Sequence, residues 1–179
     1  MKVPRRTRRG QKIRNKMKKF VVMYVNIRGI KSKHESFLNK VQEVEPTIIC
    51  ITETHLMKNE EFSIEGYSTK IRSDKDNGAG GLMIAVKNEI KNVCLKVEDS
   101  KEVGECLWIT IDNNQVKIRV GLIYAPQESR TRKEKLKLMY DGIETQIIRA
   151  REKQQRVLLL GDFNCKIGDN IKGNRKDVT

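Results

Sequence analysis

The sequence predicts a mixed α/β (α+β) fold, and three observations lead to that class. Short apolar runs rich in β-branched residues, typical of strands covered on both faces, occur near both ends of the chain. A helical pattern adjoins such a run at each end, so that one strand and helix plan occurs twice. Segments typical of strands and turns separate the two copies. With 179 residues, 37% of them hydrophobic, we expect one domain with a substantial core.

The first copy of this plan is predicted over residues 20–52. Phe20–Val25 is a continuous apolar run and is expected to form a buried strand. Ser32 and Glu35 then form a capping-box signature for a helix that Pro46 ends. The apolar positions at helical spacing are Phe37, Leu38, Val41 and Val44. Thr47–Thr52 is predicted as the second buried strand, which completes a β-α-β unit.

The middle of the chain has the pattern of short strands joined by turns. A glycine-rich turn is marked by Asp76, Asn77, Gly78, Gly80 and Gly81. This turn lacks the Gly-Lys-Ser/Thr of a phosphate-binding P-loop, so a tight turn or bulge is the better interpretation. The predicted strands are Leu82–Val86, Val93–Val97, Glu105–Ile111 and Val116–Tyr124. A turn at residues 112–114 is expected to join the last two in a hairpin.

The second copy of the plan begins with the longest predicted helix, over Arg132–Gln155. Its apolar positions step by three or four residues, while Lys, Arg and Glu fill most of the other face. These apolar positions are Leu136, Met139, Ile143, Ile147 and Ala150. The buried strand Val157–Leu160 follows and ends at Gly161 and Asp162.

The formal charge of +14 is concentrated at the start of the chain. Residues 1–19 hold ten Lys or Arg and no acid, which leaves 27 basic against 23 acidic residues, or +4, in residues 20–179. We therefore divide the chain into a basic, disordered arm, 1–19, and one domain, 20–179. Two interpretations of the arm stay open, since it can neutralise nucleic-acid phosphates or be a solvated leader.

Cysteine spacing and hydropathy favour an intracellular location. Cys50, Cys94, Cys106 and Cys165 are widely spaced and include no C-x-x-C pair, so reduced and mostly buried thiols are expected. No apolar stretch has the length of a signal peptide core or of a membrane span. We expect an intracellular, nuclear protein without a membrane partner, and the sequence leaves its oligomeric state open.

Polar side chains stand at the ends of the apolar strands. They are Asn26, Glu53, Tyr124, Asp162 and Asn164. Each alone has a structural alternative, such as a turn cap, a surface acid or a core aromatic. Five at equivalent places favour a site, because ligands of open α/β sheets gather beyond the carboxyl ends of strands. Carboxylate and amide oxygens suit Mg²⁺. Zinc is disfavoured, because His34 and His55 have no matching cysteine spacing.

Four motifs containing these residues resemble the endonuclease/exonuclease/phosphatase superfamily. In order they are Val25-Asn26-Ile27-Arg28-Gly29, Thr52-Glu53-Thr54-His55-Leu56, Ile123-Tyr124-Ala125-Pro126 and Gly161-Asp162-Phe163-Asn164. The last is the most specific, and the order and spacing strengthen the set. Glu-Thr-His-Leu, together with Gly80 and Gly81 opening a strand, is most similar to the apurinic-type endonucleases of non-LTR retrotransposons. The resemblance covers about residues 20 to 170.

The resemblance implies a role for each residue. Glu53 would bind a catalytic Mg²⁺, or Mn²⁺ in its place, with Asn26 supporting the metal and the scissile phosphate. Asp162 would orient and activate the attacking water. Asn164 would hold a phosphate oxygen, and Tyr124 would position the phosphate or the nucleophile. The resemblance to this branch also implies DNA as the substrate, contacted through its phosphate backbone. In such hydrolysis a metal and preorganised donors stabilise the charge that develops on phosphate oxygens.

The resemblance also implies a DNase I-like four-layer α/β/β/α sandwich of two packed mixed β-sheets flanked by helices. A later aspartate and a terminal Ser-Asp-His of the superfamily find no match before Thr179, so we expect a domain incomplete at its C-terminus, impaired activity and poor solubility alone. Two alternatives stay open. One is a non-catalytic nucleic-acid-binding remnant, and the other is a phosphatase or deadenylase of the same superfamily.

Overall fold

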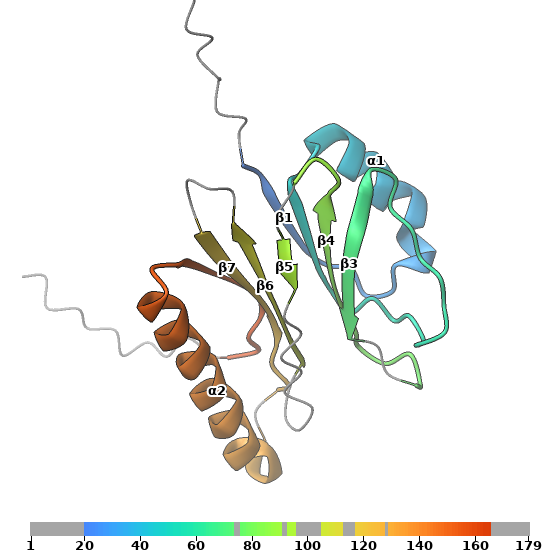
Figure 1. Ribbon diagram of the computed structural model, residues 1–179. Coiled ribbons are helices and arrows are strands. Elements are labelled where there is room, and N and C mark those ends of the chain that lie inside the picture. Colours follow the sequence, from blue (N-terminus) through green and yellow to red (C-terminus); the bar gives the residue numbers. More distant parts are fainter. Residues whose placement is uncertain are drawn as a thin grey trace, which may run out of the picture.

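Two four-stranded sheets pack face to face in the computed structural model, which describes residues 20–73, 76–90, 93–95, 105–112, 117–127 and 129–165. The first sheet has, in spatial order, β1 (Val22–Asn26), β2 (Ile48–Thr52), β4 (Leu82–Lys87) and β3 (Tyr67–Ser73). The second has β5 (Val93–Leu95), β6 (Glu105–Asp112), β7 (Lys117–Tyr124) and β8 (Arg156–Asp162). Figure 1 shows α1 (His34–Val44) outside the first sheet and α2 (Lys133–Glu152) outside the second. The four-layer α/β/β/α prediction is confirmed.

Each sheet contains one parallel pair of strands joined by a helix. In the first sheet β1 and β2 run parallel and α1 connects them, while in the second β7 and β8 run parallel around α2. The remaining pairs, β2 with β4, β3 with β4, β5 with β6 and β6 with β7, are antiparallel. Both parallel pairs therefore bring two strand carboxyl ends to one edge, as the twofold strand and helix plan predicts.

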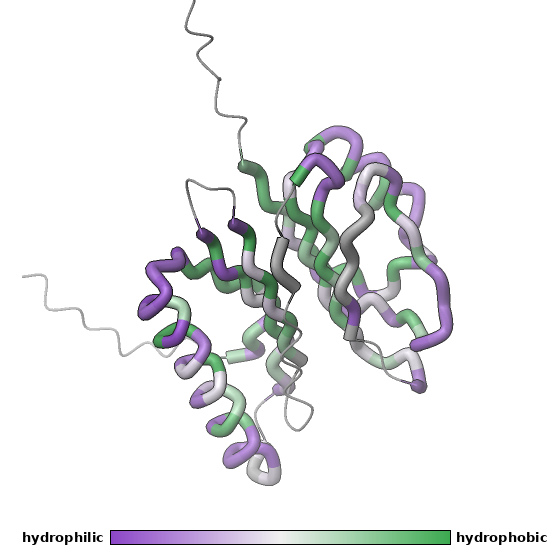
Figure 2. Tube along the Cα trace, viewed as in Figure 1, coloured by the Kyte–Doolittle hydropathy of each residue, from purple (hydrophilic) through white to green (hydrophobic). Residues whose placement is uncertain are grey.

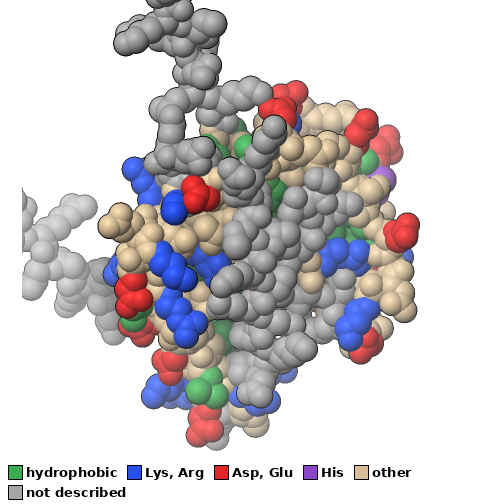
Figure 3. All heavy atoms as spheres, in the orientation of Figure 1, with side chains coloured by type: hydrophobic (Ala, Val, Ile, Leu, Met, Phe, Trp, Pro, Cys, Tyr) green, Lys and Arg blue, Asp and Glu red, His purple; other side chains and the backbone are tan. Residues whose placement is uncertain are grey.

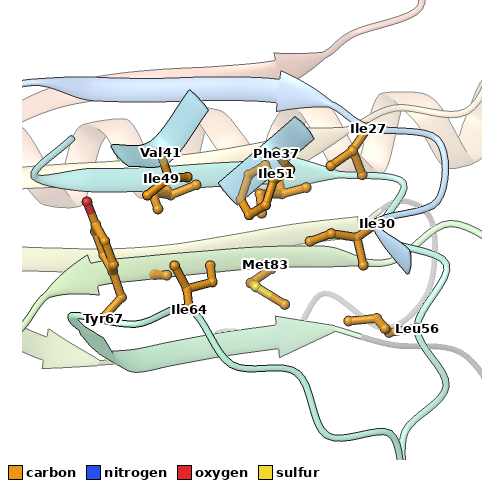
Figure 4. Close-up of a cluster of buried hydrophobic side chains, with 11 residues drawn as sticks. Ile27, Ile30, Phe37, Val41, Ile49, Ile51, Leu56, Ile64, Tyr67 and Met83 are labelled. Carbon is orange, nitrogen blue, oxygen red and sulfur yellow. The ribbon is translucent and has the colours of Figure 1, made fainter. Parts of the chain in front are cut away.

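Three apolar layers hold the sandwich together. Alternate residues of β2 divide between two of them, because successive side chains of a strand point to opposite faces. Ile48 and Cys50 belong to the layer between the sheets, whereas Ile49 and Ile51 belong to the layer under α1 (Figure 4). The third layer packs α2 on the second sheet. Figure 2 shows the strands as mostly hydrophobic and the helices as mixed.

The start of the first helix differs from the prediction. A short 3-10 turn, η1 (Lys31–Lys33), precedes α1, and the N-cap of α1 is Lys33, with no side-chain capping bond. The Ser32 hydroxyl instead donates to the Gly29 carbonyl, at 3.1 Å. The predicted capping box is therefore wrong, since a local turn takes the hydroxyl. The helix ends as expected, with Glu45 left-handed (φ 45°) just before Pro46.

The strand β3 is absent from the sequence prediction. Its segment, Tyr67–Ser73, consists mostly of polar and charged residues and, among the described strands, pairs only with β4, at one edge of the first sheet. Edge strands with this much charge lack the apolar signal of a buried strand. The β6–β7 hairpin is confirmed by its antiparallel register, although its turn at residues 113–116 lies outside the described part, as do the arm 1–19 and residues 96–97 of the expected fourth strand.

Two of the edge strands, β1 and β8, leave apolar side chains partly exposed. Among the described residues β1 pairs only with β2, and β8 only with β7. Most side chains of both strands are half-buried, and Tyr24 is exposed, whereas every residue of β2 is buried. Unpaired backbone groups on apolar strands favour association with another chain. The expected poor solubility of the isolated chain depends on these edges and stays a prediction.

In the described residues, the burial of the cysteines bears on their reactivity and the hydropathy of the helices on membrane insertion. Cys50 and Cys106 are free and buried, and Cys165 is free and exposed. Burial raises the pKa of the Cys50 thiol to about 12, which keeps it protonated and unreactive. Among the described residues, no helix has the length and apolar character needed to cross a bilayer.

A glycine in β7 makes room for the single tryptophan of the chain. A Cβ added at Gly121 would lie 2.6 Å from the Trp108 ring, which also carries the Arg119 guanidinium 5.4 Å from its centroid. Gly121→Ala is expected to displace the indole and lower the free energy of unfolding by about 1–3 kcal/mol. Urea denaturation followed by Trp108 fluorescence measures both effects, and an unchanged spectrum and midpoint would contradict this packing.

Candidate active site

Asn26 connects the two sheets at the end where β1 finishes. Its Nδ2 donates to Glu53 Oε1 at 2.9 Å and to Asp162 Oδ2 at 3.3 Å. Glu53 follows β2 in the first sheet, and Asp162 ends β8 in the second. Three of the residues singled out in the sequence therefore meet, although 136 positions separate Asn26 from Asp162. Their contact depends on the packing of one sheet on the other.

The other side-chain atom of Asn26 is an acceptor without a donor. Its Oδ1 is buried and has no hydrogen-bond partner among the described residues. Buried polar atoms are rarely left in this state without an ion, water or ligand to satisfy them. An amide oxygen next to the Glu53 and Asp162 carboxylates is the kind of donor set that Mg²⁺ accepts. The residues present therefore fit a divalent cation.

The donor set is small. In the part of the chain that the structure describes, no group of three or more His, Cys, Asp and Glu side chains could hold a metal ion. Mg²⁺ usually keeps several waters and takes one or two carboxylates together with substrate phosphate. The fit thus depends on the Asn26 oxygen and on ligands from water or substrate.

Asp162 and Asn164 are fixed by bonds at the exits of β7 and β8. The Asn164 backbone N–H donates to Asp162 Oδ1 at 3.0 Å, and the Ala125 N–H donates to the Asp162 carbonyl at 2.8 Å. One amide hydrogen of Asn164 is used on the Ala125 carbonyl, at 2.8 Å. These bonds hold the Asp162 carboxylate toward Asn26 and leave the second amide hydrogen of Asn164 for a ligand.

Tyr124 lies beside this group and also belongs to the core. It ends β7, pairs in register with Asp162, and packs half-buried against the layer between the sheets. Because paired residues of neighbouring strands share a face, Tyr124 and Asp162 lie on the side of the second sheet that faces the first. The structure thus places all five sequence-predicted residues at one end of the sandwich, and their chemical roles stay predictions.

The loops that follow β1 and β2, after Asn26 and at Glu53, are held in unusual backbone conformations. Arg28, Glu53 and His55 are left-handed, with φ of 49°, 56° and 54°. The Gly29 N–H donates to the Glu53 carbonyl, and the His55 N–H to the Gly80 carbonyl, both at 2.8 Å. Left-handed residues other than glycine are costly and persist where surrounding contacts fix them. The glycine-rich turn predicted from sequence therefore supports the Glu53 loop.

Two further side chains reach the site, and the sequence did not identify either as a site residue. His55 Nε2 lies 3.9 Å from Glu53 Oε2, and the His55 side chain is exposed. The Tyr24 hydroxyl lies 3.3 Å from Thr52 Oγ1. Partial burial raises the pKa of the Tyr24 phenol, against the lowering effect of the Thr52 bond, and the Asp162 and Glu53 carboxylates raise it further. The phenol is thus held protonated. Its position two residues before Asn26, on the same strand face, is the signal that could have found it.

Comparison with known proteins connects this arrangement to one family. The model of the Endonuclease/Exonuclease/phosphatase family matches residues 23–174. Members of that family are hydrolases that act on phosphodiester bonds, and they generally use divalent metal ions. No curated protein sequence matches the chain at a significant level.

Three solved structures illustrate the shared fold. A variant of the 3' phosphatase NExo from Neisseria, bound to product DNA hairpin, has a TM-score of 0.60 at 17% identity, over 84% of this chain and 60% of that one. An AP endonuclease from Archaeoglobus fulgidus has a TM-score of 0.57 at 18% identity, and the match covers 82% of this chain and 58% of that one. The catalytic domain of Xenopus laevis APE2 has a TM-score of 0.60 at 18% identity, and the match covers 80% of this chain and 58% of that one. This chain thus spans about three-fifths of their length.

Proposed function

We propose that this chain, which belongs to the endonuclease/exonuclease/phosphatase family, hydrolyses phosphodiester bonds in DNA with Mg²⁺, as an endonuclease of the non-LTR retrotransposon type. The observation that carries the proposal is the Asn26 bridge. It joins the Glu53 and Asp162 carboxylates across the two sheets and leaves a buried amide oxygen that receives no hydrogen bond from any described residue. If these residues had a structural role alone, we would expect that buried acceptor to be hydrogen-bonded within the protein.

Each residue has a part in the proposed hydrolysis. Glu53 and the Asn26 oxygen would hold Mg²⁺, which would supply Lewis-acid stabilisation of charge on the phosphate. Asp162 accepts a proton from the attacking water, and its orientation is set by Asn26 and by the Asn164 backbone. The free amide hydrogen of Asn164 donates to a phosphate oxygen. Tyr124 orients the phosphate beside Asp162.

The choice of DNA rests on three supports. The Neisseria enzyme among the similar structures is a 3' phosphatase bound to a product DNA hairpin, and another similar structure is an AP endonuclease. The Glu-Thr-His-Leu motif at Glu53 resembles the retrotransposon branch. The basic residues of segment 1–19 add charge that attracts phosphates. We propose that this segment is an arm separate from the domain 20–179, and that the protein acts in the nucleus.

A nicking assay tests the proposal directly. Supercoiled plasmid is incubated with Mg²⁺ and either this chain or its Asp162→Asn variant, which keeps the size of the side chain and an acceptor for Asn26. Open-circle product is expected with the unaltered chain, and EDTA and the substitution should each remove it. Nicking that survives the substitution would refute the assigned role. DNA binding without nicking would instead support the non-catalytic alternative.

A further inference from the structure

The first turns of α2 carry three lysines that form no ion pair with an acidic residue in the described part of the chain. Lys133, Lys135 and Lys137 are exposed, and none forms an ion pair with another described residue. Elsewhere in the described chain, Lys31 pairs with Glu60 and Lys117 with Asp112. We call the three α2 side chains the lysine patch. No ion pair with a described residue therefore holds any of these three side chains.

The location of the lysine patch opposes the stability of the helix. Positive side chains at a helix N-terminus are repelled by the partial positive charge of that end, and only Glu134 offsets it in the first turn. The same helix carries Arg149 and Arg151 in its last turn, where the dipole favours cations. Local conflicts of this kind in a folded chain are expected where a residue serves binding rather than folding.

The lysine patch also lies at the end of the sandwich that holds the candidate site. Tyr124 ends β7 at the site, and the chain passes through 125–132 directly into α2. Figure 1 shows the first turns of α2 beyond the sheet at the end where β7 finishes, and Figure 3 shows Lys and Arg side chains interleaved with Asp and Glu along this helix. Lys133 and Lys137 are one helical turn apart and share a side of the helix.

We propose that the lysine patch binds the phosphate backbone of the DNA duplex that enters the site, as a contact surface separate from the metal-binding residues. Exposed lysines match phosphates in charge, and two of them one turn apart can contact neighbouring phosphates of one strand. The choice of DNA rests on the proposed function. DNA binding by the lysine patch does not require catalysis, so the affinity for DNA is measured without metal.

The test is the salt dependence of duplex binding by the full chain in EDTA, followed by fluorescence anisotropy. The variant changes Lys133, Lys135 and Lys137 to Gln. Loss of the two phosphate contacts of Lys133 and Lys137 is expected to reduce the slope of log K against log salt by about 1.8, and to weaken binding about tenfold or more near physiological salt. The helix should not unfold, because removal of these charges relieves the conflict with the dipole.

A matched control removes three cations from the opposite end of the second sheet. Arg151, Lys153 and Arg156 are exposed and lie at the end of α2 and the start of β8, about 20 Å of strand away from Asp162. Changing them to Gln alters net charge equally and should leave the slope nearly unchanged. Equal weakening by both variants, or no weakening by the first, would overturn the proposal. Selective weakening in a chain that never nicks would support the surface and refute the proposed function alone.

Discussion

Glu53→Gln is expected to reduce Mg²⁺-dependent DNA cleavage by about 10³-fold, because several kcal/mol of transition-state stabilisation depend on the metal. Glutamine keeps the size of the side chain and an oxygen that accepts from Asn26 Nδ2, so the bridge between the sheets can persist. What it removes is the negative charge that attracts the cation. The free energy of unfolding without metal should therefore change little, while the affinity for Mg²⁺ or Mn²⁺ falls.

The measurement combines plasmid nicking with calorimetric titration of Mn²⁺ into the full chain. Glu61→Gln is the matched control, since Glu61 is an exposed glutamate in the segment between β2 and β3 and has no ion pair among the described residues. Its cleavage rate and metal affinity should equal those of the unaltered chain. A Glu53→Gln variant that binds Mn²⁺ normally would show that the cation binds elsewhere.

Gly161→Ala is expected to be among the most damaging single substitutions for stability. A Cβ at this position would lie 1.8 Å from the Ile123 carbonyl oxygen, and Gly161 has φ of 150°, which side-chain-bearing residues rarely adopt. Backbone cannot move aside as a flexible side chain can, so β7 and β8 would separate next to Asp162. We expect the free energy of unfolding to fall by about 3 kcal/mol or more, and the melting temperature by about 10 °C.

Gly142→Ala gives a control with the opposite sign. A Cβ at Gly142, in α2, meets no atom within 4 Å. Alanine there should stabilise the helix by about 0.5–1 kcal/mol, because glycine is a poor helix former. Thermal denaturation of both variants measures the difference. If the two substitutions had equal effects, the close approach of β7 and β8 at Gly161 would be wrong. Loss of DNA cleavage should accompany only the β8 substitution.

The sequence determined the elements whose local pattern is strong. Thr47–Thr52 is a dense apolar run, and the structure has a buried strand at Ile48–Thr52. The periodic segment from Arg132 is the long helix α2. These elements also predict the two parallel strand pairs, because a chain that forms a strand, a helix and a second strand in succession returns to the same sheet. Patterns of this kind are set by residues within one or two turns of each other, so they can be read without the fold.

Two local predictions differ from the structure, one at β3 and one at the start of α1, and each difference has a physical reason. The segment of β3 is too polar to predict a strand, and it is one because β4 offers it backbone partners. Ser32 is a good capping residue in isolation, but the tight turn at Gly29 takes its hydroxyl. In both places a contact made by the surrounding chain outweighed a preference of less than a few kcal/mol.

The list of candidate site residues came from the sequence, but only the tertiary structure decided which of them touch. Motif order placed polar residues after strands, and each strand carries its own residue to a carboxyl end. The Asn26 bridge to Asp162 requires two sheets packed at one separation, and the orphaned oxygen of Asn26 appears only in that arrangement. Tyr24 lies near the Asp162 carboxylate for the same reason, because the two sheets pack together there. Contacts between residues far apart in sequence are fixed by packing of the whole core, which no local pattern records.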